Sequence, residues 1–178
     1  MAQHPRPERR PPTDAEARAL ASTPRLRILR LCLDESLTNK EIAGRLDRDP
    51  ASVLHHVRRL VDTGFLEALP ARRGTRGARE VPYRATGKSW QLSGADGSGA
   101  EVMLQAFLEE LNEAGGEFAD SSRLGLRLNA EHRAEFIDRI GALLDEFAAR
   151  PPDPDGDRWS IYFAMHADRR GTPPERPR

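Results

Sequence analysis

A polar line runs along one face of the helix predicted for residues 51–63. Positions three, four and seven apart share a helix face, and here they hold four polar residues: Ser52, His55, His56 and Arg59. The opposite face is apolar: Val53, Val57, Leu60 and Val61. No acidic residue occurs between Pro50 and Val61. Hydroxyl, imidazole and guanidinium groups donate to base edges and phosphates, whereas carboxylates repel phosphates. The pattern predicts a surface that contacts nucleic acid, with Arg58, beside Arg59, meeting a phosphate.

A second basic cluster lies in a single glycine-containing loop. It holds four arginines: Arg72, Arg73, Arg76 and Arg79. The segments on either side, 65–69 and 81–86, read as the two strands of a hairpin. Pro82 cannot donate to a ladder, which predicts that the second strand lies at a sheet edge. A hairpin with such a basic tip is expected to contact the phosphate backbone.

Capping signals place the polar helix in a helix-turn-helix. Thr38 and Glu41 have the spacing of a capping box, which begins a short helix. Asp49 is the N-cap residue of the next helix. Only a tight turn fits between Leu46 and that cap, so the two helices form a helix-turn-helix. Thr38 and Asn39, where the first of them begins, are further candidate DNA contacts.

Two more helices are predicted upstream. Thr13 and Glu16 form a capping box for the first, and Thr23 is the expected N-cap of the second, with Pro24 in its first turn. Apolar residues nearly encircle the second helix, which predicts burial. Cys32, the only cysteine, belongs to this run and is interpreted as a core residue.

Charge is divided unevenly along the 178 residues. The whole chain has 28 basic and 28 acidic residues. Up to Trp90 there are 18 basic and 11 acidic residues, a net charge of +7, and the remainder carries 10 and 17, a net charge of −7. A basic half suggests a polyanionic partner. The sequence lacks a membrane-spanning run, a disulfide framework and a recognisable catalytic or phosphate-loop motif, which predicts a cytoplasmic protein that is not an enzyme.

The second half begins with a helix that is apolar around most of its circumference. After a glycine- and serine-rich linker at 87–99, this helix occupies about 100–111. One interpretation is a central core helix. The favoured one is an interface between two copies of the chain, formed by these residues: Met103, Phe107, Leu108 and Leu111.

Two segments further on alternate between apolar and polar residues. Residues 123–128 and 158–166 are therefore predicted strands, with a helix that begins at Asn129 between them. Two strands do not form a stable sheet alone, so they must pack on the helices or join strands of a partner. Trp159, Tyr162 and Phe163 could line an effector pocket, although aromatic strand residues usually belong to a core.

Residues from the second helix to the end of the hairpin resemble a known family. The patterns are L-R-I-L, T-x-x-E-I-A-x-x-L, S-V-x-x-H-V-R-x-L-x-x-x-G-F-L and a basic loop that ends in Y-R-A-T. Together they are similar to the winged helix-turn-helix of ArsR-type bacterial regulators. The resemblance implies a homodimer that reads a palindromic site on double-stranded DNA. It also implies that residues 51–63 form the recognition helix and that the wing arginines reach the backbone or an adjacent minor groove.

One departure from that family concerns metals. Metal-sensing members carry a cysteine pair in the helix equivalent to residues 38–46, or a cluster of His and carboxylates on a C-terminal helix. The former has no cysteine here, and His132 near Glu131 and Glu135 is interpreted as a solvated first turn. We therefore expect no metal and no cofactor.

The sequence thus predicts an α+β protein: an N-terminal winged helix-turn-helix and a C-terminal helix-strand-helix-strand module. The expected divisions are a disordered arm at 1–12, a DNA-binding domain at 13–90, a dimerisation or effector domain at 98–166 and a disordered tail at 167–178. The predicted function is sequence-specific transcription regulation by a metal-independent homodimer. The alternatives are a protein-interaction module or a small-molecule sensor that binds an unknown effector.

Overall fold

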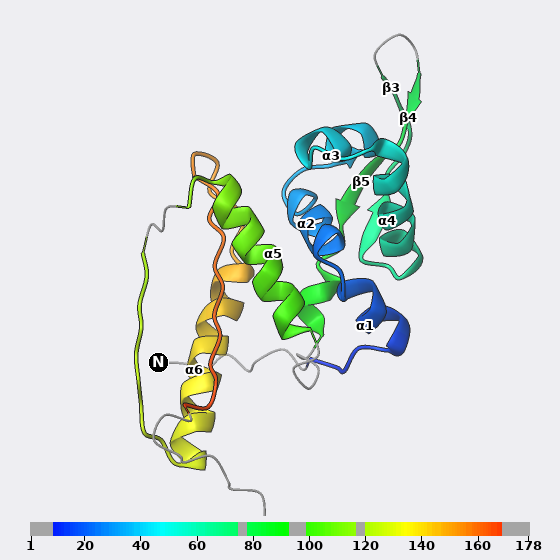
Figure 1. Ribbon diagram of the computed structural model, residues 1–178. Coiled ribbons are helices and arrows are strands. Elements are labelled where there is room, and N and C mark those ends of the chain that lie inside the picture. The colour runs from blue at the N-terminus through cyan, green and yellow to red at the C-terminus, as the bar shows by residue number, and fades with distance from the viewer. Residues whose placement is uncertain (1–8, 75–77, 93–98, 117–119, 169–178) are drawn as a thin grey trace, which may run out of the picture. The chain divides into compact units, whose positions relative to one another are not determined.

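The computed structural model describes residues 9–74, 78–92, 99–116 and 120–168 (Figure 1). The chain forms two compact units. One comprises Pro7–Glu117, and the other comprises Met1–Arg6 with Phe118–Arg178. None of the helices in the described ranges is both long enough and apolar enough to cross a bilayer.

The first two helices begin at capping residues. Helix α1 (Asp14–Leu20) has the predicted capping box, in which the Thr13 hydroxyl accepts the N–H of Glu16 and the carboxylate of Glu16 accepts the N–H of Thr13. Helix α2 (Thr23–Leu31) has Ser22 as its N-cap. The expected N-cap, Thr23, is the first helical residue instead, so that prediction was wrong by one position.

Helices α3 (Asn39–Arg45) and α4 (Pro50–Asp62) form the predicted helix-turn-helix. The Asp49 carboxylate accepts the amides of Ala51 and Ser52 at 2.9 and 3.0 Å, which satisfies donors that the helix leaves free. In the turn, Asp47 has a φ of 48°, a conformation that Asp tolerates better than most residues.

Helix α4 ends where Gly64 adopts a φ of 74°. The Gly64 N–H donates to the carbonyl of Val61 and the Phe65 N–H donates to the carbonyl of Leu60, both at 2.9 Å. This pair of bonds is a Schellman motif, and it requires the left-handed conformation that glycine adopts without strain. Phe65 is buried directly after it, and strand β2 (Leu66–Ala68) follows.

The hairpin strand that contains Pro82 is central in its sheet. Strand β5 (Pro82–Ala85) pairs antiparallel with β2 on one side and with β1 (Leu37–Thr38) on the other. The prediction of an edge strand was therefore wrong. Pro82 is tolerated because it is the first residue of β5, and its carbonyl still accepts the N–H of Leu69 at 2.9 Å. Strand β1 is too short for a sequence pattern to reveal.

The helices and the three-stranded sheet enclose one core. It consists mainly of aliphatic residues: Ala19, Ile28, Leu29, Cys32, Leu37, Ile42, Ala43, Leu46, Val53, Val57, Leu60, Phe65, Leu66 and Leu92. Burial raises the pKa of the Cys32 thiol to about 12, so this cysteine is a core residue. The remaining strands, β3 (Arg72–Arg73) and β4 (Arg79–Glu80), pair with each other outside the core.

Two segments that were assigned to an arm and a linker are part of this unit. Residues 88–91 form a 3-10 helix, η2 (Lys88–Gln91), which places Leu92 in the core. The N–H of Arg10 donates to the carbonyl of Gln91, and the Arg9 guanidinium lies 4.4 Å from the centre of the Trp90 ring. Residues 9–12 therefore lie against the domain. The rest of the predicted arm falls outside the described residues.

Helix α5 (Ala100–Glu113) belongs to the same unit and packs against α2 (Figure 1). The sequence analysis had instead placed this helix in the C-terminal domain, at residues 98–166.

The second unit is built around helix α6 (Ala130–Ala148). Its N-cap is Asn129, as predicted, and the Asn129 side chain accepts the N–H of His132. The two strands expected at 123–128 and 158–166 are absent: both segments are described, and neither forms a strand. An alternating sequence sets which side chains share a face, but a strand also needs a hydrogen-bonded neighbour. In the second segment, the centre of the Phe163 ring lies 6.3 Å from the centre of the Phe136 ring on α6. The predicted tail lies mostly outside the described residues, at 169–178.

Candidate nucleic-acid interface

Helix α4 buries its apolar stripe and leaves its polar face toward solvent. Val53, Val57 and Leu60 are fully buried. The polar residues differ in exposure: Ser52, His55 and Arg58 are exposed, whereas His56 and Arg59 are half-buried. The face that remains outside carries hydrogen-bond donors and positive charge without any carboxylate between Pro50 and Val61.

The half-buried end of this face is a cluster of cations. Burial lowers the pKa of His56, and so do the charges of Arg25, His55 and Arg48, so the imidazole is neutral at neutral pH. Its Nδ1 is buried and has no hydrogen-bond partner within the described part of the chain. Burial also lowers the pKa of Arg25, with a further contribution from Arg59. Such crowding of positive groups favours an anion at this surface.

Arg25 was not among the predicted site residues. It comes from α2, and its Nη2 donates to the carbonyl of Arg18 at 2.7 Å, which holds it beside the end of α1. The only signal in the sequence was a basic residue in the first turn of α2, where nothing indicates that α4 lies nearby.

Two predicted contacts are engaged within the helix-turn-helix itself. Thr38 is 4% exposed, and its hydroxyl caps α3. Asn39 is half-buried and donates to the carbonyl of Pro50 at 2.8 Å, which ties the start of α3 to the start of α4. Asn39 thus helps to fix the angle between the two helices, whereas Thr38 stabilises the start of α3.

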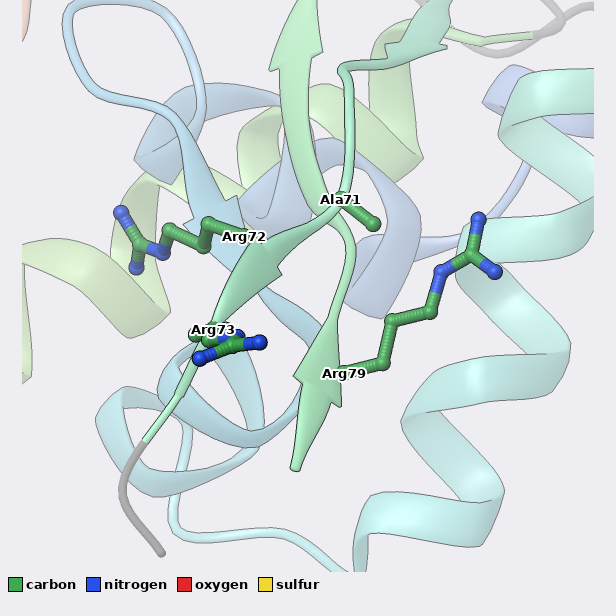
Figure 2. Close-up of a pocket in the computed structure, with 4 residues that line it drawn as sticks. All are labelled: Ala71, Arg72, Arg73 and Arg79. Carbon is green, nitrogen blue, oxygen red and sulfur yellow. The ribbon is translucent and has the colours of Figure 1, made fainter. Parts of the chain in front are cut away.

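The wing is a short hairpin in which register decides which arginines share a face. Arg73 lies directly opposite Arg79, and Arg72 lies opposite Glu80. Figure 2 shows Arg72 and Arg79 extending to opposite sides of this hairpin, around a pocket of about 360 Å³ whose other lining residues are Ala71 and Arg73. Like charges directly opposite each other destabilise a hairpin unless an anion lies between them. Arg76 lies outside the described residues.

Arg72 is held by an acid of the helix-turn-helix. Its Nη2 donates to Glu41 at 3.0 and 3.2 Å. The same carboxylate accepts the N–H of Thr38 at 2.7 Å in the capping box of α3. The Thr38 amide, the Thr38 hydroxyl and the charge of Arg72 lower the pKa of Glu41, so it stays ionised. This exposed ion pair therefore links the base of the wing to α3.

At Gly74 the Glu80 side chain occupies the space that a Cβ would take. A Cβ at this position would lie 2.1 Å from the Cδ of Glu80. Glycine thus allows the Glu80 carboxylate to fold over the hairpin backbone.

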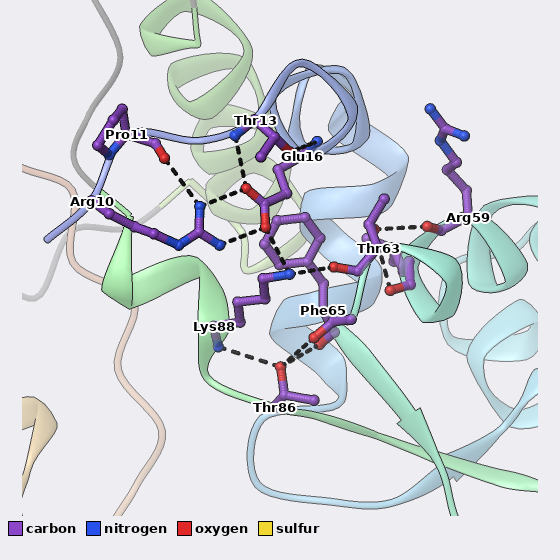
Figure 3. Close-up of polar contacts among 11 residues, drawn as sticks. Arg10, Pro11, Thr13, Glu16, Arg59, Thr63, Phe65, Thr86 and Lys88 are labelled. Atoms are coloured by element: carbon purple, nitrogen blue, oxygen red, sulfur yellow. Dashed lines mark hydrogen bonds and ion pairs between the residues drawn. The ribbon is translucent and has the colours of Figure 1, made fainter.

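A buried carboxylate supports the C-terminal end of α4 (Figure 3). Glu16 is 5% exposed, and it accepts two hydrogen bonds from Arg10, at 2.6 and 2.8 Å. The Lys88 ammonium lies 2.7 Å from the same carboxylate and donates to the carbonyl of Thr63, the C-cap of α4, also at 2.7 Å. The Arg10 and Lys88 cations hold the pKa of Glu16 far below its usual range.

We call Arg10, Glu16, Lys88 and Thr63 the α4 brace. The sequence revealed only one part of it, the capping role of Glu16. Lys88 had no signal, because its partners are distant along the chain. Nearby, the Thr86 hydroxyl donates to the carbonyl of Gly64 at 2.8 Å, which holds the turn after α4 in place.

The predicted interface residues on α5 differ in exposure. Met103 is 46% exposed and Leu108 is 40% exposed, whereas Phe107 and Leu111 are half-buried. Ala106 is the buried residue of α5. For metals, the described ranges contain no group of three or more His, Cys, Asp or Glu side chains that could hold an ion.

Comparison with known proteins finds a family match over part of the chain. Residues 25–67 match the family model described as winged helix-turn-helix DNA-binding. The matched segment runs from α2 through the helix-turn-helix to β2. The chain therefore carries a winged helix-turn-helix fold within an α+β architecture, as the sequence predicted. No curated protein matches the chain.

Several solved structures are similar over part of the chain. Reduced HlyU from Vibrio cholerae is 22% identical over 53% of this chain and 84% of its own, with a TM-score of 0.34. The homodimeric winged helix-turn-helix domain of Mb0332 from Mycobacterium bovis, titled a possible ArsR-family regulator, is 21% identical over 60% and 82%, with a TM-score of 0.33. Wild-type ZitR from Lactococcus lactis in complex with DNA is 23% identical over 70% and 74%, with a TM-score of 0.32.

The α4 brace generates a prediction about stability and pH. Replacing Glu16 with Gln should lower the free energy of unfolding at pH 7 by about 2 kcal/mol, because two cations lose a charged acceptor. The pKa of Glu16 is lowered in the folded state, so its contribution is complete above the ordinary Glu pKa of about 4.3 and is lost as pH falls. The free energy of unfolding, measured with urea between neutral and acid pH, should therefore depend less on pH for Glu16→Gln than for the wild type. Glu67→Gln is the control, since the Glu67–Arg84 pair is exposed and should contribute less than about 1 kcal/mol. Equal losses in the two variants would contradict a structural role for the brace.

Proposed function

We propose that this chain is a transcription regulator that binds specific sites on double-stranded DNA as a homodimer. The observation that carries the proposal is the exposed face of α4, which has donors and cations but no carboxylate, in a fold whose wing adds further exposed arginines. The regulator acts by occupying its site, as neither an enzyme nor a metal sensor. This assignment agrees with the ArsR-type motifs in the sequence.

In this proposal, α4 enters the major groove. Ser52, His55 and the outer atoms of His56 and Arg59 face base edges, and Arg58 meets a phosphate. A neutral His56 suits this role, because its Nδ1 is buried and its other ring nitrogen, Nε2, can form one directional hydrogen bond with a base instead of acting as a diffuse charge. The α4 brace and the contact between Asn39 and Pro50 hold the helix at both ends.

The wing arginines divide into two roles. Arg73 and Arg79 are exposed and face each other across the hairpin, so a phosphate between them relieves their repulsion. Arg72 is already paired with Glu41, and it serves to position the wing. Arg76 is proposed as a further backbone contact from the sequence alone.

The surface between copies is proposed on α5. Met103 and Leu108 are large apolar residues that remain exposed on a helix of the DNA-binding unit. Phe107 and Leu111 extend this surface. Pairing two copies through it places two recognition helices on one duplex, which suits a palindromic site.

The wing assignment predicts a change in salt dependence. Replacing Arg73 and Arg79 together with alanine should weaken binding to all duplexes, because two phosphate contacts are lost. The slope of log K against log salt should become shallower by about 2, since each contact contributes roughly 0.9. Fluorescence anisotropy at several salt concentrations measures this slope. The control is Arg84→Ala, because Arg84 pairs with Glu67 on the sheet and should leave the slope unchanged. If the double variant keeps the wild-type slope, the wing does not touch the backbone. If the wild type itself binds without salt dependence, a protein-interaction module becomes the better interpretation.

The recognition face predicts a loss of selectivity. Arg59→Ala and His56→Ala should each reduce the preference for a duplex selected by the wild type over random DNA, by about 1–3 kcal/mol. Arg58→Ala should instead lower the affinity for both duplexes by the same factor, because it removes a phosphate contact. Competition titrations give the two affinities, and circular dichroism checks folding. Equal losses on both duplexes for Arg59→Ala and His56→Ala would show that this face does not read bases.

The proposed interface predicts the oligomeric state. The wild type should be a dimer at micromolar concentration, and Leu108→Glu should give folded monomers because it places a charge in the apolar surface. Analytical ultracentrifugation measures both. Glu101→Gln, at the exposed start of α5, should remain dimeric. A monomeric wild type, or a dimeric Leu108→Glu, would contradict the assignment of α5.

A further inference from the structure

A buried arginine of α2 is paired with acids of α5. Arg27 is 7% exposed, and its Nη1 lies 3.5 Å from Oε2 of Glu109. Its Nη2 donates to the carboxylate of Glu113, 86 residues away in the sequence. A guanidinium buried to this extent is strongly destabilising without partners, and both partners here come from one helix. We call these three residues the α2–α5 ion cluster.

The charge pattern of α5 makes a cation favourable at its C-terminal end. All the charged residues in its last two turns are acidic: Glu109, Glu110 and Glu113. The C-terminus of a helix carries partial negative charge, so acids there are unfavourable and a cation is favourable. Arg27 supplies that cation from a different helix. The end of α5 is therefore stabilised where it lies on α2.

The apolar side chains of α5 are buried to different extents. The buried residue of α5 is an alanine, Ala106. The large side chains of Met103, Leu104 and Leu108 are 46%, 41% and 40% exposed. Ala106, together with the half-buried Phe107 and Leu111, supplies the apolar contact. A guanidinium that engages two carboxylates one turn apart adds a directional constraint on the rotation and register of α5.

We propose that Arg27 is a positioning residue that, through Glu109 and Glu113, sets the orientation of α5 on the DNA-binding core. The inference rests on the proposed function in one respect: α5 is the proposed surface between copies. Its orientation on each core then determines the distance and angle between the two recognition helices. Arg27 therefore controls which spacing of half-sites the dimer accepts, although it lies on a helix that does not read bases.

Hydrogen exchange of the full chain tests whether the ion cluster holds α5 in place. Two variants break the cluster from opposite sides: Arg27→Leu, and Glu109→Gln combined with Glu113→Gln. Both should raise amide exchange in residues 102–113 by about tenfold or more. Glu101→Gln removes an acid from the same helix outside the cluster and should change nothing. Arg27→Leu combined with Glu109→Leu and Glu113→Leu should restore protection, because the ion cluster is then replaced as a whole and no buried charge is left without a partner.

Binding measurements test the second step. The probes are a duplex selected from a random pool by the wild type, its single half-site, and duplexes whose half-sites are moved by a few base pairs. The wild type should prefer one spacing by about tenfold or more. The two cluster variants should bind the single half-site as the wild type does but bind the different spacings alike. A general loss of folding would weaken the half-site as well, which distinguishes destabilisation from mispositioning.

Two results would overturn the inference. One is wild-type exchange of α5 in both cluster variants. The other is a faster-exchanging α5 with an unchanged spacing preference, which would show that its orientation does not control the dimer. If the wild type binds no duplex, the proposed function fails, and the exchange measurement alone then decides whether Arg27 holds α5.

Discussion

Helix α4 has to bury one face in the core and present the other to solvent, and the rest of the N-terminal unit follows from that constraint. Its apolar stripe of Val53, Val57 and Leu60 is fully buried in the common core. Because this stripe is continuous, α4 cannot rotate without exposing it, so the polar face has a fixed direction. A rigid backbone with one face outward is what base reading requires, since a displaced side chain loses its hydrogen bonds.

The carboxylates of this unit hold elements together, away from the face of α4. Glu16 joins α1 to the segment after the sheet, Glu41 joins α3 to the wing, and Glu109 and Glu113 join α5 to α2. Each acid neutralises a cation of another element. These four acids thereby serve the fold, while Arg58 of α4 and Arg73 and Arg79 of the β3–β4 hairpin remain exposed for a polyanion.

The two units differ in how far their apolar side chains are buried and their extended segments are paired. In the N-terminal unit, helices and sheet share one core, and every strand in its described part has a neighbour. In the C-terminal unit, Leu124 is 72% exposed and Ile161 is 77% exposed, although both belong to alternating segments. Alternation predicted strands there because it is a local property. A ladder needs a second chain segment at about 4.8 Å, which alternation does not provide.

Local sequence signals determined the helices and their limits: the capping box of Thr13, that of Thr38, the cap at Asp49 and the left-handed Gly64 all act within a few residues. They also determined which face of α4 is polar, because periodicity along a helix needs no partner. Only the tertiary structure decided that Thr38 is buried, that Pro82 starts a central strand, and that Arg27 and Lys88 hold distant helix ends. Ion pairs and ladders join residues that are far apart in the chain, and the energy of such a contact depends on distance and burial in space, which spacing along a sequence does not specify.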